Sequence, residues 1–234
     1  MSLIIAISVP EGIVISGDSR MIVTMSKDEA DPKEPDKIIK TKIPIIISDY
    51  ADKIFCLYER FGIGTFGESM INGLPISHHI KEFEYKYNTD PPKTTEALSD
   101  CLRKYFRTLS QPKKILSFLV AGYDNNIPFL YGIELAKNET ARQNISPDES
   151  LIYCIGRGGE PDIVDRLLSQ PQFIPSFAYM NLQDAVDYSR HLIRLTIDQM
   201  RFESRVATIG GDIDTLLVTT DGAKFLLKKE IKCS

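Results

Sequence analysis

The first twenty residues constrain the fold of this chain most strongly. Residues 3–9 are an almost continuous apolar run, and residues 13–15 are a second one, after a Pro-Glu-Gly turn at positions 10–12. Strands that are buried on both faces of a sheet carry such runs. We therefore predict two central strands, at residues 2–9 and 12–19. Because chain ends normally fray, a central strand that begins here makes residue 2 itself a functional candidate.

The composition is that of an ordinary globular protein. The chain has 234 residues and a formal net charge of −4. This length suits one sizeable core, and the slight acidic excess gives no reason to expect nucleic acid or an anionic membrane as a partner. The apolar start is too short to cross a bilayer and lacks the features of a signal peptide. Four scattered cysteines predict neither a metal cluster nor a disulfide framework, so a cytoplasmic protein is expected.

Hydrophobic periodicity predicts the remaining elements. The clearest helix begins after Asn181, a good N-cap with Asp184 three residues on. The glycine-rich stretch at 156–159 is interpreted as a tight turn before another helix, which has Pro161 in its first turn. Helices are expected at residues 75–87, 94–109, from 161 onward and at 181–202, and strands at 54–58, 61–66, 115–122, 127–135, 151–156, 213–219 and 223–228.

The segment at about residues 22–52 is predicted to be an extended loop. Residues 28–42 are charged and contain Pro32 and Pro35, which is typical of a solvated connection. The apolar residues 43–47 could then add an edge strand, because Pro44 excludes them from a central position.

The order of elements indicates the fold class. Strands, two helices, strands, two helices and strands follow one another along the chain. Two stacked antiparallel sheets with helix pairs on both outer faces would bury all of these segments. The predicted class is therefore α+β, a four-layer α/β/β/α sandwich, in a single domain over residues 1–234.

Five short motifs in this order carry a resemblance to a known family. The motifs are Ile-Ser-Gly-Asp-Ser-Arg at 15–20, Lys-Ile-Phe at 53–55, Gly-Thr-Phe-Gly at 64–67, Gly-Arg-Gly-Gly at 156–159 and Gly-Gly-Asp-Ile-Asp at 210–214. Together with the order of elements, they resemble the proteasome-type N-terminal nucleophile (Ntn) hydrolases, and most closely the bacterial proteasome-like and β-type subunits. The resemblance covers almost the whole chain.

The resemblance implies a catalytic role for four residues. The family's nucleophile is the first residue of the mature first strand, and counting back from Asp18 that position is Ser2. Lys53 matches the family's active-site lysine, which Asp18 would pair with and hold in place. Gly67 matches the glycine whose backbone N–H binds the oxyanion, and we expect it where a strand meets a helix.

These residue types have a chemical rationale. A hydroxyl needs a base to become a nucleophile, and the α-amine of an N-terminal serine can supply one. A lysine ammonium nearby would disfavour protonation of that amine. The resemblance thus implies a protease, a hydrolase that cuts peptides or unfolded proteins inside a homo-oligomeric ring without a cofactor or metal. It leaves open whether an ATPase partner feeds the ring.

Departures from the family's pattern bear on activity. Active members usually carry threonine where this chain has Ser2. The family's accessory serine and aspartate align with Arg157 and Val206, although Glu203 and Ser204 lie near enough in the sequence to substitute. The alternative is therefore a non-catalytic ring subunit, similar to the α-type subunits, or a pseudoenzyme.

A second alternative is a lipase of the GDS type. The Gly-Asp-Ser sequence at 17–19 follows a strand, and Ser19 would be its nucleophile. Such enzymes need an Asp-x-x-His near the C-terminus, whereas Asp187 and His191 are one residue too far apart. Structural interpretations are preferred for four other polar residues, a solvated helix face for His78 and His79 and strand-start polarity for Asp212 and Asp214.

Overall fold

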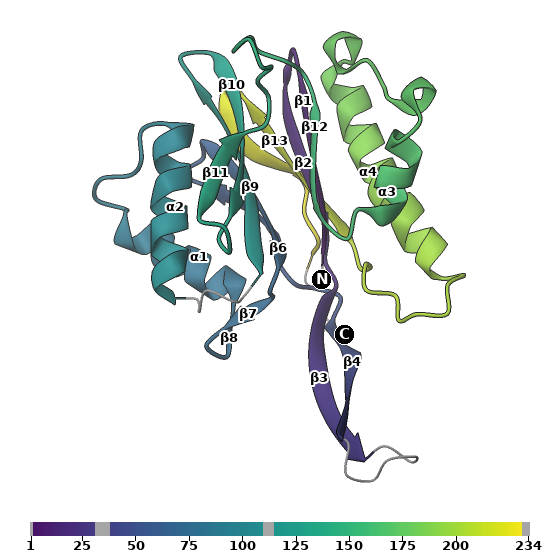
Figure 1. Ribbon diagram of the computed structural model, residues 1–234. Coiled ribbons are helices and arrows are strands. Elements are labelled where there is room, and N and C mark those ends of the chain that lie inside the picture. The colour runs from purple at the N-terminus through teal and green to yellow at the C-terminus, as the bar shows by residue number, and fades with distance from the viewer. Residues whose placement is uncertain (1, 31–37, 110–114, 231–234) are drawn as a thin grey trace.

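The computed structural model describes residues 2–30, 38–109 and 115–230 (Figure 1). Its two larger sheets have five strands each, and every pairing within them is antiparallel. The mixed α+β class with antiparallel sheets is thus confirmed. The first sheet has the order β12 (Ile155–Gly159), β1 (Leu3–Val9), β2 (Gly12–Asp18), β13 (Ile213–Thr219) and β14 (Gly222–Leu227). The second has the order β11 (Glu139–Arg142), β10 (Ile127–Glu134), β9 (Leu116–Asp124), β6 (Phe61–Gly67) and β5 (Ile54–Leu57).

Four α-helices lie in the described part of the chain. The last begins as predicted, because the Asn181 side chain accepts a hydrogen bond of 2.8 Å from the Asp184 N–H. In Figure 1, α1 and α2 lie beside the second sheet, and α3 and α4 beside the first. The helices are α1 (Ile76–Lys86), α2 (Thr95–Leu109), α3 (Asp162–Leu168) and α4 (Leu182–Met200), with short 3-10 turns at Pro171–Phe173 and Phe177–Tyr179.

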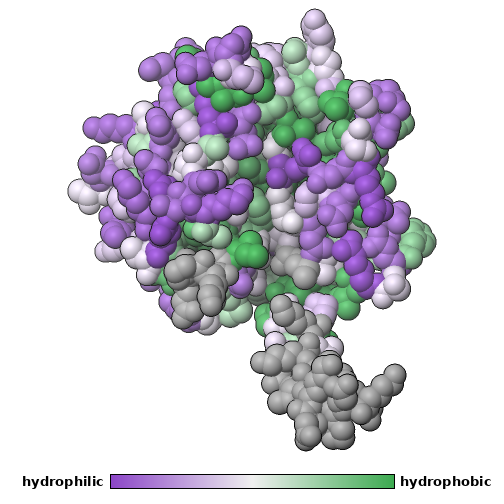
Figure 2. Space-filling model, viewed as in Figure 1, coloured by the Kyte–Doolittle hydropathy of each residue, from purple (hydrophilic) through white to green (hydrophobic). Residues whose placement is uncertain are grey.

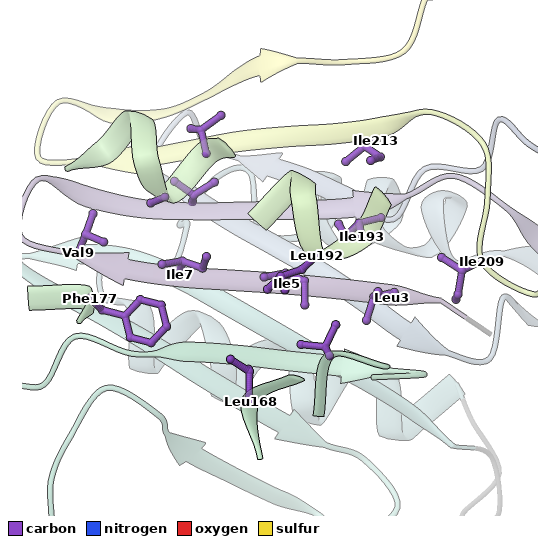
Figure 3. Close-up of a cluster of buried hydrophobic side chains, with 14 of the residues drawn as sticks. Leu3, Ile5, Ile7, Val9, Leu168, Phe177, Leu192, Ile193, Ile209 and Ile213 are labelled. Carbon is purple, nitrogen blue, oxygen red and sulfur yellow. The ribbon is translucent and has the colours of Figure 1, made fainter. Parts of the chain in front are cut away.

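The strand β1 explains the continuous apolar run at the start of the sequence. Its odd-numbered residues, Leu3 to Val9, pack into a cluster with Leu192 and Ile193 of α4 (Figure 3). Its even-numbered residues Ile4 and Ala6 pack into another cluster with side chains of the second sheet, such as Leu119. Both faces of β1 are therefore buried, as the sequence predicts. Eight of the nine predicted strands have counterparts that begin and end within two residues of the prediction, and β13 has the predicted bounds. The exception is the strand predicted at 151–156.

The predicted loop at 22–52 is wrong over most of its length. Strands β3 (Met21–Ala30) and β4 (Ile38–Ser48) pair into an antiparallel ribbon that projects away from the two sheets (Figure 1). Residues 31–37 lie outside the described part of the chain. The predicted strand at 43–47 is part of β4, and Pro44 lies opposite Thr24 in this two-stranded ribbon.

The glycine-rich stretch at 156–159 is also not the turn that was expected. It forms most of β12 and pairs with β1, so the strand predicted at 151–156 lies about four residues too early. The physical reason is close approach: a Cβ at Gly158 would lie 2.2 Å from the Phe66 ring, and one at Gly159 1.7 Å from the Ser2 carbonyl oxygen. Glycine is thus needed here for packing against the start of β1.

Two smaller expectations also fail around Gly67. The chain does not pass directly from β6 into a helix, because the short strands β7 (Met70–Ile71) and β8 (Leu74–Pro75) intervene before α1. His79 does not lie on a solvated face of α1. Its side chain is buried, with Nε2 3.1 Å from the Ile71 carbonyl oxygen and Nδ1 3.0 Å from Glu82.

The visible surface is polar where the helices lie. In Figure 2, hydrophilic side chains cover much of both flanks, over the helix pairs labelled in Figure 1. No helix in the ranges described above combines the length and apolarity that a membrane crossing requires.

The contact between the two sheets predicts the effect of a small substitution in β6. A Cβ at Gly64 would lie 2.5 Å from Cγ2 of Ile4. Gly64→Ala should therefore destabilise the fold by about 1–3 kcal/mol through overpacking. The matched control is Gly132→Ala in β10, where the three atoms nearest the added Cβ belong to the flexible Gln143 side chain. Urea unfolding measures both, and equal stability of the two variants would contradict the packing described.

Candidate active site

Asp18 is the centre of the candidate site. It is the last residue of β2, and the residue as a whole is 1% exposed. Oδ1 accepts hydrogen bonds from the Leu3 N–H at 2.9 Å and the Lys53 ammonium at 2.8 Å. Oδ2 accepts from the N–H groups of Arg20 at 3.2 Å and Gly210 at 3.1 Å. One carboxylate thus joins the start of β1, Lys53 and the segment before β13.

Lys53 lies directly before β5 and is buried, at 6% exposure. Its carbonyl oxygen accepts a hydrogen bond of 2.9 Å from the Thr65 N–H, which fixes its backbone against β6. Burial lowers the pKa of Lys53 below its ordinary value, Asp18 opposes this shift, and the positive charges of Lys229 and Arg20 add to it. The side chain therefore holds a positive charge next to Asp18 that is easier to remove than that of a surface lysine.

Ser2 is connected to the Asp18–Lys53 ion pair through its neighbour Leu3. It precedes β1 and is 5% exposed, and its neighbour Leu3 shares Asp18 Oδ1 with Lys53. Ser2 and Lys53 also line one cavity of about 220 Å³, together with Thr65 and Ser69. The structure therefore brings three of the predicted site residues, Ser2, Asp18 and Lys53, to one place.

Gly67 does not line the cavity that holds Ser2. It ends β6 with a φ of 101°, where a Cβ would lie 2.1 Å from the Ile115 carbonyl oxygen, so only glycine fits. It lines a second, larger cavity of about 540 Å³. Glu68 and Ser69 line both cavities, so the two adjoin at the residues that follow Gly67.

The base of the β3–β4 ribbon supplies cavity walls that the sequence did not indicate. Met21, Ser48 and Tyr50 line the cavity around Ser2, and residues 22–24 line the larger one. Because the sequence predicted a loop for this segment, it did not predict that the segment lines either cavity. Arg20, the last residue of the Ile-Ser-Gly-Asp-Ser-Arg motif, holds this segment in place, because its Nε forms an ion pair of 2.6 Å with Asp49.

A second lysine with a buried side chain, Lys229, forms ion pairs next to the site. Lys229 Nζ donates to Asp214 Oδ2 at 2.5 Å and to Asp52 Oδ1 at 2.8 Å. Asp214 is thus a buried ion-pair partner rather than a strand-start polar residue. Asp52 lines the Ser2 cavity, so the end of the chain beyond β14 is connected to the cavity wall by this ion-pair network.

The accessory positions are engaged elsewhere or exposed. The Arg157 guanidinium pairs with Asp165 of α3, and Val206 is 40% exposed. Glu203 accepts a hydrogen bond of 2.6 Å from Arg205 Nε. Neither aligned residue therefore has the character of the serine or aspartate that the family carries there.

The lipase alternative does not fit the geometry. Ser19 is fully buried, and its hydroxyl donates a hydrogen bond of 2.8 Å to the Asp212 carbonyl oxygen. A nucleophile must be reachable by substrate, so this interpretation is wrong. In the ranges that the structure describes, no group of three or more His, Cys, Asp or Glu side chains is placed to hold a metal ion.

Comparison with models of known protein families gave no match, and comparison with curated protein sequences gave none either.

The buried ion pair predicts the effect of removing its anion. Asp18→Asn leaves the Lys53 ammonium buried without its counter-charge, which should destabilise the fold by about 3–5 kcal/mol. Asp49→Asn is the matched control, because its partner Arg20 and its own carboxylate, 40% exposed, keep contact with water. This control should cost about 1 kcal/mol or less. Chemical unfolding measures both losses, and a loss for Asp18→Asn no larger than that of the control would contradict the ion pair's structural role.

Proposed function

We propose that this chain is a proteasome-like peptidase of the N-terminal nucleophile type, with Ser2 as its nucleophile. The observation that carries the proposal is the meeting of Ser2 and Lys53 in one cavity, with Asp18 bound both to Lys53 and to the residue after Ser2. These are the residues that the resemblance selects from the sequence. Positions 2, 18 and 53 come from three separate segments, so their meeting is a consequence of the fold.

The proposal includes the four-layer α/β/β/α sandwich in one domain. Three separate apolar clusters support it. One contains residues of β1 and α4, a second contains residues of both large sheets, and a third contains residues of β9 and α2. This alternation of clusters and elements is what helix pairs on the outer faces of two stacked sheets would produce.

The proposed reaction begins once Ser2 is the first residue of the chain. Its neutral α-amine takes the hydroxyl proton, directly or through water, and Oγ attacks a peptide carbonyl carbon. The Gly67 N–H is the candidate donor to the oxyanion, as the resemblance implies. The amine then gives the proton to the leaving peptide nitrogen as the C–N bond breaks, which leaves an ester on Ser2. Water hydrolyses this ester and regenerates the hydroxyl.

Lys53 has an electrostatic role in this scheme. Its positive charge beside the peptide that joins Ser2 to Leu3 disfavours protonation of the Ser2 amine, and so keeps the base available. Asp18 holds the ammonium in place through a bond of 2.8 Å. The Asp18 carboxylate offsets the free-energy cost of burying this ammonium. Lys53 itself is not the general acid or base in this scheme.

The alternative is a non-catalytic ring subunit or pseudoenzyme. It is favoured by the side chains at the accessory positions, where Arg157 pairs with Asp165 and Val206 is exposed. The intact mass of the native protein distinguishes the two. A retained Met1 would block the α-amine and favour the non-catalytic subunit.

Substitution of the nucleophile tests the peptidase proposal. Ser2→Ala should lower kcat/KM for fluorogenic peptides by at least about 10³-fold, because the attacking oxygen is lost. Ser2→Thr should retain activity, since a hydroxyl and an amine remain. Ser8→Ala is the matched control in β1: the Ser8 hydroxyl is buried and lacks a hydrogen-bond partner within the described ranges. Activity that survives in Ser2→Ala would refute the proposal.

The ring assembly has its own test. We propose that α1 and α4 contribute to subunit contacts, and each has an exposed aromatic side chain at or just beyond its end, Tyr85 at 86% and Phe202 at 81%. Static light scattering should give a multimer for the native chain, and Tyr85→Asp with Phe202→Asp should shift it toward smaller species. A monomeric native chain at micromolar concentration would contradict confined proteolysis.

A further inference from the structure

Glu160 directly follows the last residue of β12 and lies beside Ser2. The register pairs Leu3 with Gly159, and the Glu160 N–H donates a hydrogen bond of 2.9 Å to the Ser2 carbonyl oxygen. Residues directly opposed on antiparallel strands have neighbouring side chains. The positive φ of Gly159, 100°, allows the chain to approach Ser2 this closely. Glu160 is thus held beside the candidate nucleophile by the backbone itself.

The two oxygens of the Glu160 carboxylate have different surroundings. Oε2 accepts a hydrogen bond of 2.7 Å from the Thr208 hydroxyl and lies 3.4 Å from an Arg205 nitrogen. Oε1 is buried and has no hydrogen-bond partner in residues 2–30, 38–109 or 115–230. Leaving a buried carboxylate oxygen without a hydrogen-bond donor costs free energy of folding, so such an oxygen calls for an explanation, such as a donor that binds in the functional state. Thr208 and Arg205 therefore fix the carboxylate while leaving one oxygen available.

We propose that Glu160 is a positioning residue whose Oε1 accepts a hydrogen bond from the α-amine of Ser2 once Ser2 is the first residue. This inference rests on the proposed function, because it requires an N-terminal Ser2. Glu160 would hold the amine against the hydroxyl from which it takes the proton. It thereby performs the task for which Arg157 and Val206 have no suitable group.

Glu203, which the sequence offered as a substitute at the accessory positions, already has a partner. Glu203 binds Arg205 Nε at 2.6 Å, on the guanidinium that also faces Glu160. Among the described residues, the charged side chains that line the Ser2 cavity are Asp52, Lys53 and Glu68, and Lys53 is paired with Asp18. Glu160, by contrast, has its backbone N–H bonded to Ser2 itself.

The contact has a measurable electrostatic consequence. A carboxylate next to an α-ammonium stabilises the charged form and raises the pKa of the amine, whereas Lys53 acts in the opposite direction. Removing the charge of Glu160 should therefore lower the pKa of the amine. The acid limb of the kcat/KM profile should move to lower pH, while the plateau rate falls because the amine is less well oriented.

The experiment uses the full chain with Ser2 exposed by cleavage of an N-terminal tag. Competitive acetylation across about pH 5–9, read by mass spectrometry of the N-terminal peptide, gives the pKa of the amine without requiring catalysis. Glu160→Gln should lower this pKa by about one unit. Glu203→Gln, the matched loss of a carboxylate from the same Arg205, should leave it unchanged. Glu160→Asp keeps the charge and shortens its reach, so the pKa should change less than in Glu160→Gln.

The outcomes separate this inference from the proposed function. An unchanged amine pKa in Glu160→Gln, or an equal shift in Glu203→Gln, overturns the role of Glu160 even if the native chain hydrolyses peptides. A shift confined to Glu160→Gln supports the contact even if no peptide is cleaved, in which case the peptidase proposal fails by itself. If Glu160→Gln does not fold, Glu160→Asp decides: an amine pKa and a plateau rate equal to those of the native chain overturn the role.

Discussion

The site depends on one buried carboxylate. Asp18 has almost no contact with solvent, and an isolated charge in such a place would cost several kcal/mol. Its four donors are therefore a requirement of folding and not only of chemistry. Three of those donors come from β1, the residue before β5 and the segment before β13, and the fourth is the N–H of the nearby Arg20. Satisfying Asp18 therefore brings three distant parts of the chain to the end of β2. The geometry of the candidate site is in this sense a by-product of neutralising one charge.

Close backbone approach is the second constraint. Gly158 passes the Phe66 ring and Gly159 passes the Ser2 carbonyl group at distances that no side chain would permit. Gly64 has the same role between the two sheets, against Ile4. These glycines lie in strands, where glycine is intrinsically unfavourable, so their positions are explained by what they face. The edge of the first sheet can consequently lie directly against the start of β1.

Sequence reasoning succeeded where burial fixes the pattern and failed where it does not. Residues 3–9 had to be a central strand because both faces of β1 are covered. Lys53 was selected only through the resemblance, since no local pattern marks it. Ser2 was indicated by its place at the start of a central strand, and its role as a nucleophile came from the resemblance. The β3–β4 ribbon was missed because it projects away from the two large sheets. Its sequence therefore lacks the alternation of apolar and polar residues that marks a strand with one buried face. The strand at 155–159 was missed because clustered glycines normally indicate a turn. Only the folded structure shows that Gly158 is needed to pack against the Phe66 ring.

The ribbon base and the candidate site are parts of one arrangement. Arg20 binds Asp49 through two hydrogen bonds, of 2.6 and 2.9 Å, and also donates to the Ala207 carbonyl oxygen at 2.9 Å. The adjacent Thr208 holds Glu160, and Gly210 holds Asp18. One guanidinium thus joins the ribbon to the short segment that orients both carboxylates near Ser2. A displacement of the ribbon base would therefore be transmitted to residues 207–210, and through them to Glu160 and Asp18 on both sides of Ser2. The base of the ribbon is consequently a structural part of the candidate site.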